Sequence, residues 1–261
     1  MGHPRVDPRV DLVQGDVRDA ATVGEAMRNV TVVVSAIQGL VGHGRVSPAS
    51  VDRDGNAVLV DAAGRHGAEV VLLSVAGAAA DASFELARMK HAAERRLSDS
   101  GCPATIIRPA AFVQTWVEIL RASAGRGRRP RVLARGDNPI PWVDVHEVAA
   151  VVVRAVEDPG LRGRTLDLVG PEPLTLHQLA QSVMAALGWP DEPQRIPPAV
   201  VRMIAGTVGV ARPQVRRLCL MALAMDQMSH PDDGATRLLF PGLASSGAGD
   251  VVAGMLSTGS R

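Results

Sequence analysis

Short apolar runs rich in β-branched residues alternate with longer segments of helical spacing through the first half of the chain. The runs that predict strands are residues 10–14, 30–36, 70–74 and 104–107. They are nearly continuous instead of alternating with polar residues, which is typical of strands covered on both faces. The segments between them, residues 20–28, 49–66 and 84–100, have the length and spacing of helices. This order predicts an α/β fold, a parallel sheet with right-handed crossovers.

The second half of the chain is predicted to be mainly helical. Asp144 with Glu147, and Thr175 with Gln178, have the spacing of capping boxes that open helices. The second of these helices is expected to stop at Gly188, with Pro190 beyond it. A short strand is predicted at residues 165–169, and helices from residue 197 to about residue 228. The remainder is rich in glycine and serine, and its pattern predicts no element.

The composition is that of an ordinary globular chain. Of its 261 residues 46% are hydrophobic and 21% charged, and the formal net charge of +1 gives no electrostatic reason for binding nucleic acid or an anionic membrane. No apolar run reaches the roughly 18 residues that span a bilayer. No apolar signal core opens the chain, and its two cysteines lie far apart. We therefore predict a cytoplasmic protein with no nucleic-acid or membrane partner.

Three other patterns have plain structural interpretations. The seven histidines and two cysteines lack metal-ligand spacing, so no metal site is predicted. The basic run at residues 121–135 has no interleaved aromatic residues, which favours a solvated loop. Methionines 221, 225 and 228 have helical spacing, which favours a core or a partner-facing stripe.

Six stretches, in order, resemble the landmarks of one family. They are residues 14–19 (QGDVRD), 32–39 (VVVSAIQG), 72–75 (LLSV) with 88–94 (RMKHAAE), 105–112 (TIIRPAAF), 143–149 (VDVHEVA) and 170–175 (GPEPLT). The chain thereby resembles the NmrA-like branch of the atypical, extended-type short-chain dehydrogenase/reductases. The resemblance implies a Rossmann-like, doubly wound parallel sheet that is N-terminally incomplete. It also implies a nucleotide-binding domain at residues 1–160 and a small substrate or partner region at residues 161–261.

The resemblance assigns a set of residues to a bound NAD or NADP. Asp16 would lie beside the adenine, and Ser35, Ala36 and Gln38 along the riboses. Lys90, the only lysine in the chain, would bind the nicotinamide ribose. Pro109 and Phe112 would bound the nicotinamide. These positions lie at the carboxyl ends of the predicted parallel strands, where open α/β sheets bind ligands.

The catalytic set of the family is only partly present. Ser74 and Lys90 occupy the serine and lysine positions and are the candidate catalytic residues, but the tyrosine position is Leu86. The chain contains no tyrosine, and leucine can neither donate nor accept a proton. If hydride transfer occurs, the proton must come from water, His91 or the substrate.

The glycine-rich phosphate loop of the family is also missing. Gly39, Gly42 and Gly44 have the wrong spacing and follow the wrong strand. The charged residue that follows the second strand in the family, and that separates NAD from NADP there, is missing too, so the choice between NAD and NADP is not readable. The strand at residues 30–36 is expected to expose an unpaired apolar edge, unless residues 10–14 pair beside it. We interpret the opening of the chain as a misassigned start or a truncated relic.

Each candidate residue also has a structural interpretation. Lys90 could be a solvated helix charge, Ser74 could end a strand through backbone hydrogen bonds, and Asp16 could cap a turn. Asn56 is expected to be structural support. The function predicted is NAD(P)-dependent reduction of a small quinone or carbonyl compound. The alternatives are a non-catalytic NAD(P)-sensing or complex-assembly module, with a homo-oligomeric or protein partner, and a product that binds no cofactor.

Overall fold

The central sheet has four parallel strands in the order β1-β2-β3-β6. The computed structural model describes residues 7, 9–189, 192–229 and 231–258; Pro190, predicted as a helix stop, lies outside them. The strands are β1 (Val32–Ser35), β2 (Glu69–Leu73), β3 (Ala104–Pro109) and β6 (Thr165–Leu168). In register, Val33 of β1 lies opposite Val70, and Val71 of β2 lies opposite Thr105. The α/β fold class predicted from the alternating pattern is confirmed.

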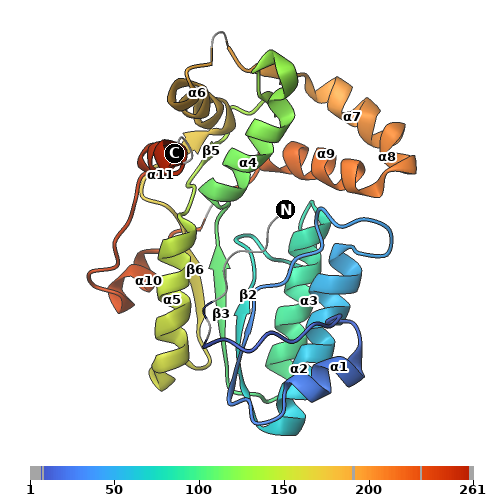
Figure 1. Ribbon diagram of the computed structural model, residues 1–261, viewed down its shortest axis with the longest axis vertical. Coiled ribbons are helices and arrows are strands. Elements are labelled where there is room, and N and C mark those ends of the chain that lie inside the picture. Colours follow the sequence, from blue (N-terminus) through green and yellow to red (C-terminus); the bar gives the residue numbers. More distant parts are fainter. Residues whose placement is uncertain (1–6, 8, 190–191, 230, 259–261) are drawn as a thin grey trace.

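Helices cover both faces of this sheet (Figure 1). Helix α5 (Val145–Glu157) lies on one face, and α2 (Asp54–His66) and α3 (Glu85–Asp99) lie on the other, with α1 (Ala20–Ala26) packed on α2. Val71 packs with the α5 cluster, whereas its neighbours Val70 and Leu72 pack with α2 and α3. Successive strand side chains point to opposite faces, and here both faces are buried. This is why the strand sequences are continuously apolar.

The remaining elements form a helical layer beyond the carboxyl ends of the strands (Figure 1). They are α4 (Val113–Ala124), η2 (Gly125–Gly127), β4 (Arg131–Leu133), β5 (Pro139–Ile140), β7 (Leu174–Thr175), α6 (Leu176–Leu187), β8 (Gln194–Ile196), α7 (Pro198–Gly206), α8 (Val208–Ala211), α9 (Pro213–Met225) and α11 (Ala248–Thr258). The short η1 (Ala49–Arg53), η3 (Pro159–Leu161) and α10 (Gly234–Leu239) complete the described elements. Helices α10 and α11 were not predicted, because glycine and serine dominate their surroundings.

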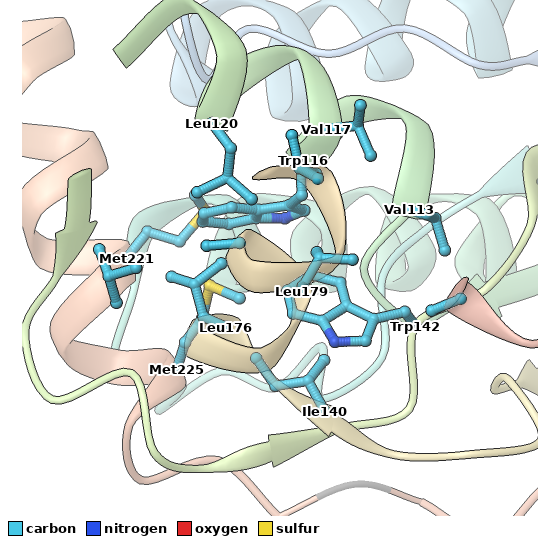
Figure 2. Close-up of a cluster of buried hydrophobic side chains, with 14 of the residues drawn as sticks. Val113, Trp116, Val117, Leu120, Ile140, Trp142, Leu176, Leu179, Met221 and Met225 are labelled. Atoms are coloured by element: carbon cyan, nitrogen blue, oxygen red, sulfur yellow. The ribbon is translucent and has the colours of Figure 1, made fainter. Parts of the chain in front are cut away.

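The helical layer has its own apolar core (Figure 2). Trp116 of α4 meets Trp142 edge to face, with ring centroids 5.7 Å apart. The Trp142 indole N–H donates to the Leu174 carbonyl at 2.8 Å, so this buried ring has its polar atom satisfied. Leu179 of α6 and Met221 of α9 belong to the same cluster. This core fixes α4, α6 and α9 relative to one another above the sheet.

The predicted helix signals are largely confirmed. Thr175 and Gln178 form the complete capping box of α6, and Gly188 ends that helix in the left-handed region with φ +60°. Asp144 caps α5 by accepting from the His146 N–H, but Glu147 instead pairs with Arg237 at 2.8 Å. The second half of that predicted capping box is therefore wrong, because a distant arginine takes the glutamate.

The strand predicted at residues 10–14 is wrong. This segment has no strand assignment, and its apolar side chains lie in water, with Leu12 76% exposed. Local β-branched character does not make a strand without a ladder partner and a buried face. Within the described residues β1 pairs only with β2, and Val34 is 45% exposed. The expected unpaired apolar edge is confirmed, and residues 10–14 do not cover it.

Gly170, just beyond β6, is required by the close approach of two backbone segments. A Cβ at this position would lie 1.8 Å from the Trp142 carbonyl oxygen. We expect Gly170→Ala to lower the free energy of unfolding by about 2 kcal/mol, because the backbone must shift to relieve the overlap. Urea denaturation measures this, with Gly24→Ala in the open middle of α1 as the matched control. Equal stability of the two variants would contradict the prediction.

Candidate functional site

A cavity of about 320 Å³ lies between the carboxyl ends of β1, β2 and β3 and the helical layer. We call it the apolar cavity, because most of its lining is aliphatic, aromatic or methionine side chains. Its walls include Phe112, Trp116 and Ile119 from the β3 exit and α4, and Met221 and Met225 from α9. Figure 2 shows Trp116, Met221 and Met225 together. A cavity of this size and lining is typical of a site for a small organic molecule.

Five residues assigned from the sequence line this cavity together: Gln38, Ser74, Lys90, Pro109 and Phe112. They come from three strand ends and one helix, spread over about a third of the chain. Leu86, at the tyrosine position of the family, lines the same cavity. The parallel register explains the convergence, because the carboxyl ends of adjacent strands meet at one edge of the sheet.

The Ser74 hydroxyl is buried and has no hydrogen-bond partner among the described residues. The residue is 7% exposed, and its backbone N–H continues the ladder by donating to the Ile107 carbonyl at 2.7 Å. A buried hydroxyl without a partner costs about 1–3 kcal/mol. The backbone of Ser74 therefore serves the sheet, whereas its hydroxyl is buried and unpaired in a residue that lines the apolar cavity. Such a group is suited to a ligand.

Lys90 is not a solvated helix charge, because it is 3% exposed. Its Nζ donates to the Ile37 carbonyl at 2.8 Å and to the Leu73 carbonyl at 2.9 Å. It also lies 3.1 Å from Oδ1 of Asp52. An ammonium group has three donors, and three oxygens surround this one. Lys90 thus ties together the exits of β1 and β2.

Asp52 was missed by the sequence analysis, although a buried lysine requires an acidic partner somewhere in the fold. It lies in η1 and is 0% exposed, and its Oδ2 accepts from the Gly39 N–H at 2.8 Å. Burial raises the pKa of the Asp52 carboxyl and lowers the pKa of the Lys90 ammonium. The attraction between the two charges opposes both shifts.

The other assigned residues lie outside the lining of the apolar cavity. The Ser35 hydroxyl donates to Asn56 Oδ1 at 2.6 Å, and Asn56 Nδ2 donates to the Asp52 carbonyl, so Asn56 is the predicted structural support. Ala36 is exposed at the end of β1. Asp16 is held by Arg18, whose side-chain hydrogen bonds lower the pKa of Asp16 to about 2. The cofactor roles of these three residues stay predictions.

The glycines after β1 pack their own loop. A Cβ on Gly39 would lie 2.3 Å from the Ser47 carbonyl oxygen, and Arg217 of α9 donates to the Gly42 carbonyl at 2.8 Å.

Across the described residues, no helix has the length and apolar character to cross a membrane, and no cluster of three or more His, Cys, Asp or Glu could hold a metal. Away from the rim residues Thr115 and Glu118, which are exposed, the polar groups of this region are Ser74, Gln38 and the Lys90–Asp52 pair.

Comparisons with known proteins point to one family. Residues 3–159 match the family described as NAD(P)H-binding. The (4-alkanoyl-5-oxo-2,5-dihydrofuran-3-yl)methyl phosphate reductase of Streptomyces griseus is 32% identical over 185 residues, which cover 69% of this chain and 60% of that protein. The NAD(P)H azoreductase of Xenophilus azovorans is 27% identical over 183 residues, with the same two coverages. The chain thus spans 60% of the length of these curated relatives.

The fold has a close match among solved structures. An NADPH-dependent quinone oxidoreductase from Escherichia coli, solved with NADPH, superposes with a TM-score of 0.72 at 20% identity. The match covers 93% of this chain and 82% of that one. At this identity the likeness concerns the fold, including the helical layer above the strand ends.

Proposed function

This chain belongs to the NAD(P)H-binding family, and from that premise we propose that it is a reductase that uses NADH or NADPH to reduce a small apolar acceptor. The observation that carries the proposal is that Ser74, whose buried hydroxyl has no partner among the described residues, lines an apolar cavity at the strand ends. In open α/β sheets this is the place where ligands bind. The named relatives that are reductases support the same reaction class.

The residues present fit the nicotinamide half of the cofactor. Pro109 and Phe112 provide an apolar wall for the nicotinamide, and Ser74 lines the same cavity, where it is assigned to the acceptor. Lys90 would take a ribose hydroxyl in exchange for one of its carbonyl acceptors, Ile37 or Leu73. Asp16, Ser35 and Ala36 are proposed for the adenosine side. The glycines described after β1 pack their own loop, so we assign no residue to the pyrophosphate.

When bound, the cofactor supplies a hydride. Ser74 Oγ–H would donate to the acceptor oxygen and stabilise the negative charge that develops there. Trp116, Phe112 and Met225 surround this place with apolar side chains, and a less polar environment would strengthen that hydrogen bond. The positive charge of Lys90 is balanced by Asp52. Lys90 therefore contributes by holding the ends of β1 and β2, which form one wall of the cavity.

The leucine at the tyrosine position narrows the class of acceptor, and His91 is not among the described residues that line the cavity. Leu86 lines the cavity where the family has its tyrosine, and it supplies no proton. A ketone reduced by hydride becomes a strongly basic alkoxide that needs an acid at once. A quinone instead becomes a hydroquinone monoanion, a stabilised phenolate that takes its proton from water. We therefore favour quinone-like, conjugated acceptors over simple carbonyl compounds.

The reductase proposal predicts that filling the cavity blocks turnover. NADPH and NADH are titrated against tryptophan fluorescence, and 2-methyl-1,4-naphthoquinone and benzaldehyde are then offered as acceptors. We expect the original chain to turn over the quinone. Thr115 lies at the exposed rim of the cavity, and Thr115→Trp is expected to lower kcat/KM about tenfold. Ala122→Trp, exposed on the same helix but not lining the cavity, is the matched control. Cofactor binding without turnover of either acceptor would reject the reductase and favour a non-catalytic binding module.

A further inference from the structure

A second, smaller pocket of about 70 Å³ adjoins the apolar cavity. The two share four lining residues, which are Leu40, Phe84, Leu86 and Met221. The smaller pocket lies between the first turn of α3 and the middle of α9. Its polar lining differs sharply from that of the apolar cavity, because it includes Arg88, Arg216 and Arg217. We call it the arginine pocket.

The arginine pocket concentrates positive charge in a chain that is nearly neutral overall. Three guanidinium groups and one carboxylate, Glu85, line it, whereas the whole chain carries a formal charge of +1. Within the described part of the chain, none of the three arginines forms an ion pair: Arg88 and Arg217 donate to backbone carbonyls. Guanidinium groups without carboxylate partners are the usual ligands of phosphate and carboxylate groups.

Two further features favour an anion at this place. The Nε of Arg217 is buried and has no hydrogen-bond partner among the described residues. Helix α3, 15 residues long, begins at Glu85 without a side-chain cap, and its positive end borders the pocket. The carboxylate of the neighbouring cavity, Glu118, is exposed and pairs with Arg121 at 3.1 Å, so it opposes an anion only weakly.

We propose that the substrate carries an anionic group, a phosphate or a carboxylate, that binds in the arginine pocket while its apolar body occupies the apolar cavity. The inference rests on the proposed function, because it assigns the apolar cavity to the substrate. It adds a specificity determinant: Arg88 and Arg216 select acceptors with a negative charge beside the reducible ring. Arg217 also positions the loop after β1 through the Gly42 carbonyl.

The test compares three compounds that share one apolar body. Isothermal titration of the whole chain with 2-naphthyl phosphate, 2-naphthoate and 2-naphthol measures what the anionic group adds. We expect at least one of the two anions to bind about tenfold more tightly than 2-naphthol, as charge-assisted hydrogen bonds would provide. The tighter of the two identifies the head group as phosphate or carboxylate.

Charge reversal locates the anion. Arg216→Glu is expected to weaken the tighter anion about tenfold and to leave 2-naphthol binding unchanged, which also shows that the variant is folded. Arg202→Glu, an exposed arginine of α7 outside the pocket, is the matched control and should change neither. Equal binding of all three compounds, or equal weakening of anion binding by both variants, would contradict the proposal that the arginine pocket binds an anion. The proposed function would still stand. If none of the naphthyl compounds binds, the assignment of the apolar cavity to the substrate is also contradicted, and with it the proposed function.

Discussion

Lys90→Met is expected to lower the free energy of unfolding by about 3–5 kcal/mol, the range for removing one partner of a buried ion pair. The substitution keeps the length of the side chain but removes the positive charge paired with Asp52, a carboxylate that is fully buried. It also leaves the Ile37 and Leu73 carbonyls without their donor. Urea denaturation followed by tryptophan fluorescence measures the loss.

The double variant Lys90→Met/Asp52→Leu separates the buried charge from the rest of the effect. Removing both charges eliminates the uncompensated carboxylate, so most of the lost stability should return. The recovery is expected to be partial, because the Gly39 N–H loses its acceptor and the two carbonyls stay unpaired. A double variant less stable than Lys90→Met, or a single variant as stable as the original chain, would show that the pair does not organise this region.

The same pair has a consequence for the cavity. Gln38 and Ser74, which line it, directly follow the two residues whose carbonyls Lys90 holds. Loss of the ammonium group would therefore remove the hydrogen bonds that position both Gln38 and Ser74. We therefore assign Lys90 and Asp52 a positioning role, since they hold Gln38 and Ser74 in place. The proposed contact of Lys90 with the ribose is a separate role.

Ser74→Ala is expected to reduce turnover of 2-methyl-1,4-naphthoquinone about 100-fold, the scale of losing one donor to a developing negative charge. Cofactor affinity should change little, because the hydroxyl is assigned to the acceptor oxygen. Stability should be unchanged or slightly higher, since the hydroxyl removed has no partner within the described structure. The measurements are kcat and KM at saturating cofactor, with urea denaturation alongside.

Ser182→Ala provides the control for this prediction. Ser182 lies on α6 away from the cavity, and its hydroxyl donates to the Gln178 carbonyl at 3.1 Å. Its loss should leave turnover unaltered. If Ser74→Ala instead keeps full activity, or loses stability without losing activity, then the hydroxyl has a structural role and the proposed function loses the observation that carries it.

Prediction from the sequence was most informative for residues that follow strands, although their functional roles stay predictions. Ser74, Pro109 and Gln38 were assigned from motifs at strand ends, and the structure places all three around one cavity. It failed at residues 10–14, where the β-branched composition was right but no ladder partner exists in the described structure. Strand formation depends on a neighbour that the local sequence cannot specify.

Local periodicity by itself determined the layered α/β fold, the two-sided burial of its strands and the capping box at Thr175, because these depend on residues a few positions apart. Only the tertiary structure decided which polar groups are paired. Lys90 meets Asp52 38 positions away, and the arginine pocket joins Arg88 to Arg216 and Arg217. The Ser74 hydroxyl was left unpaired by the same packing. Pairing of buried polar groups depends on neighbours from distant segments, and their positions exist only once the chain has folded.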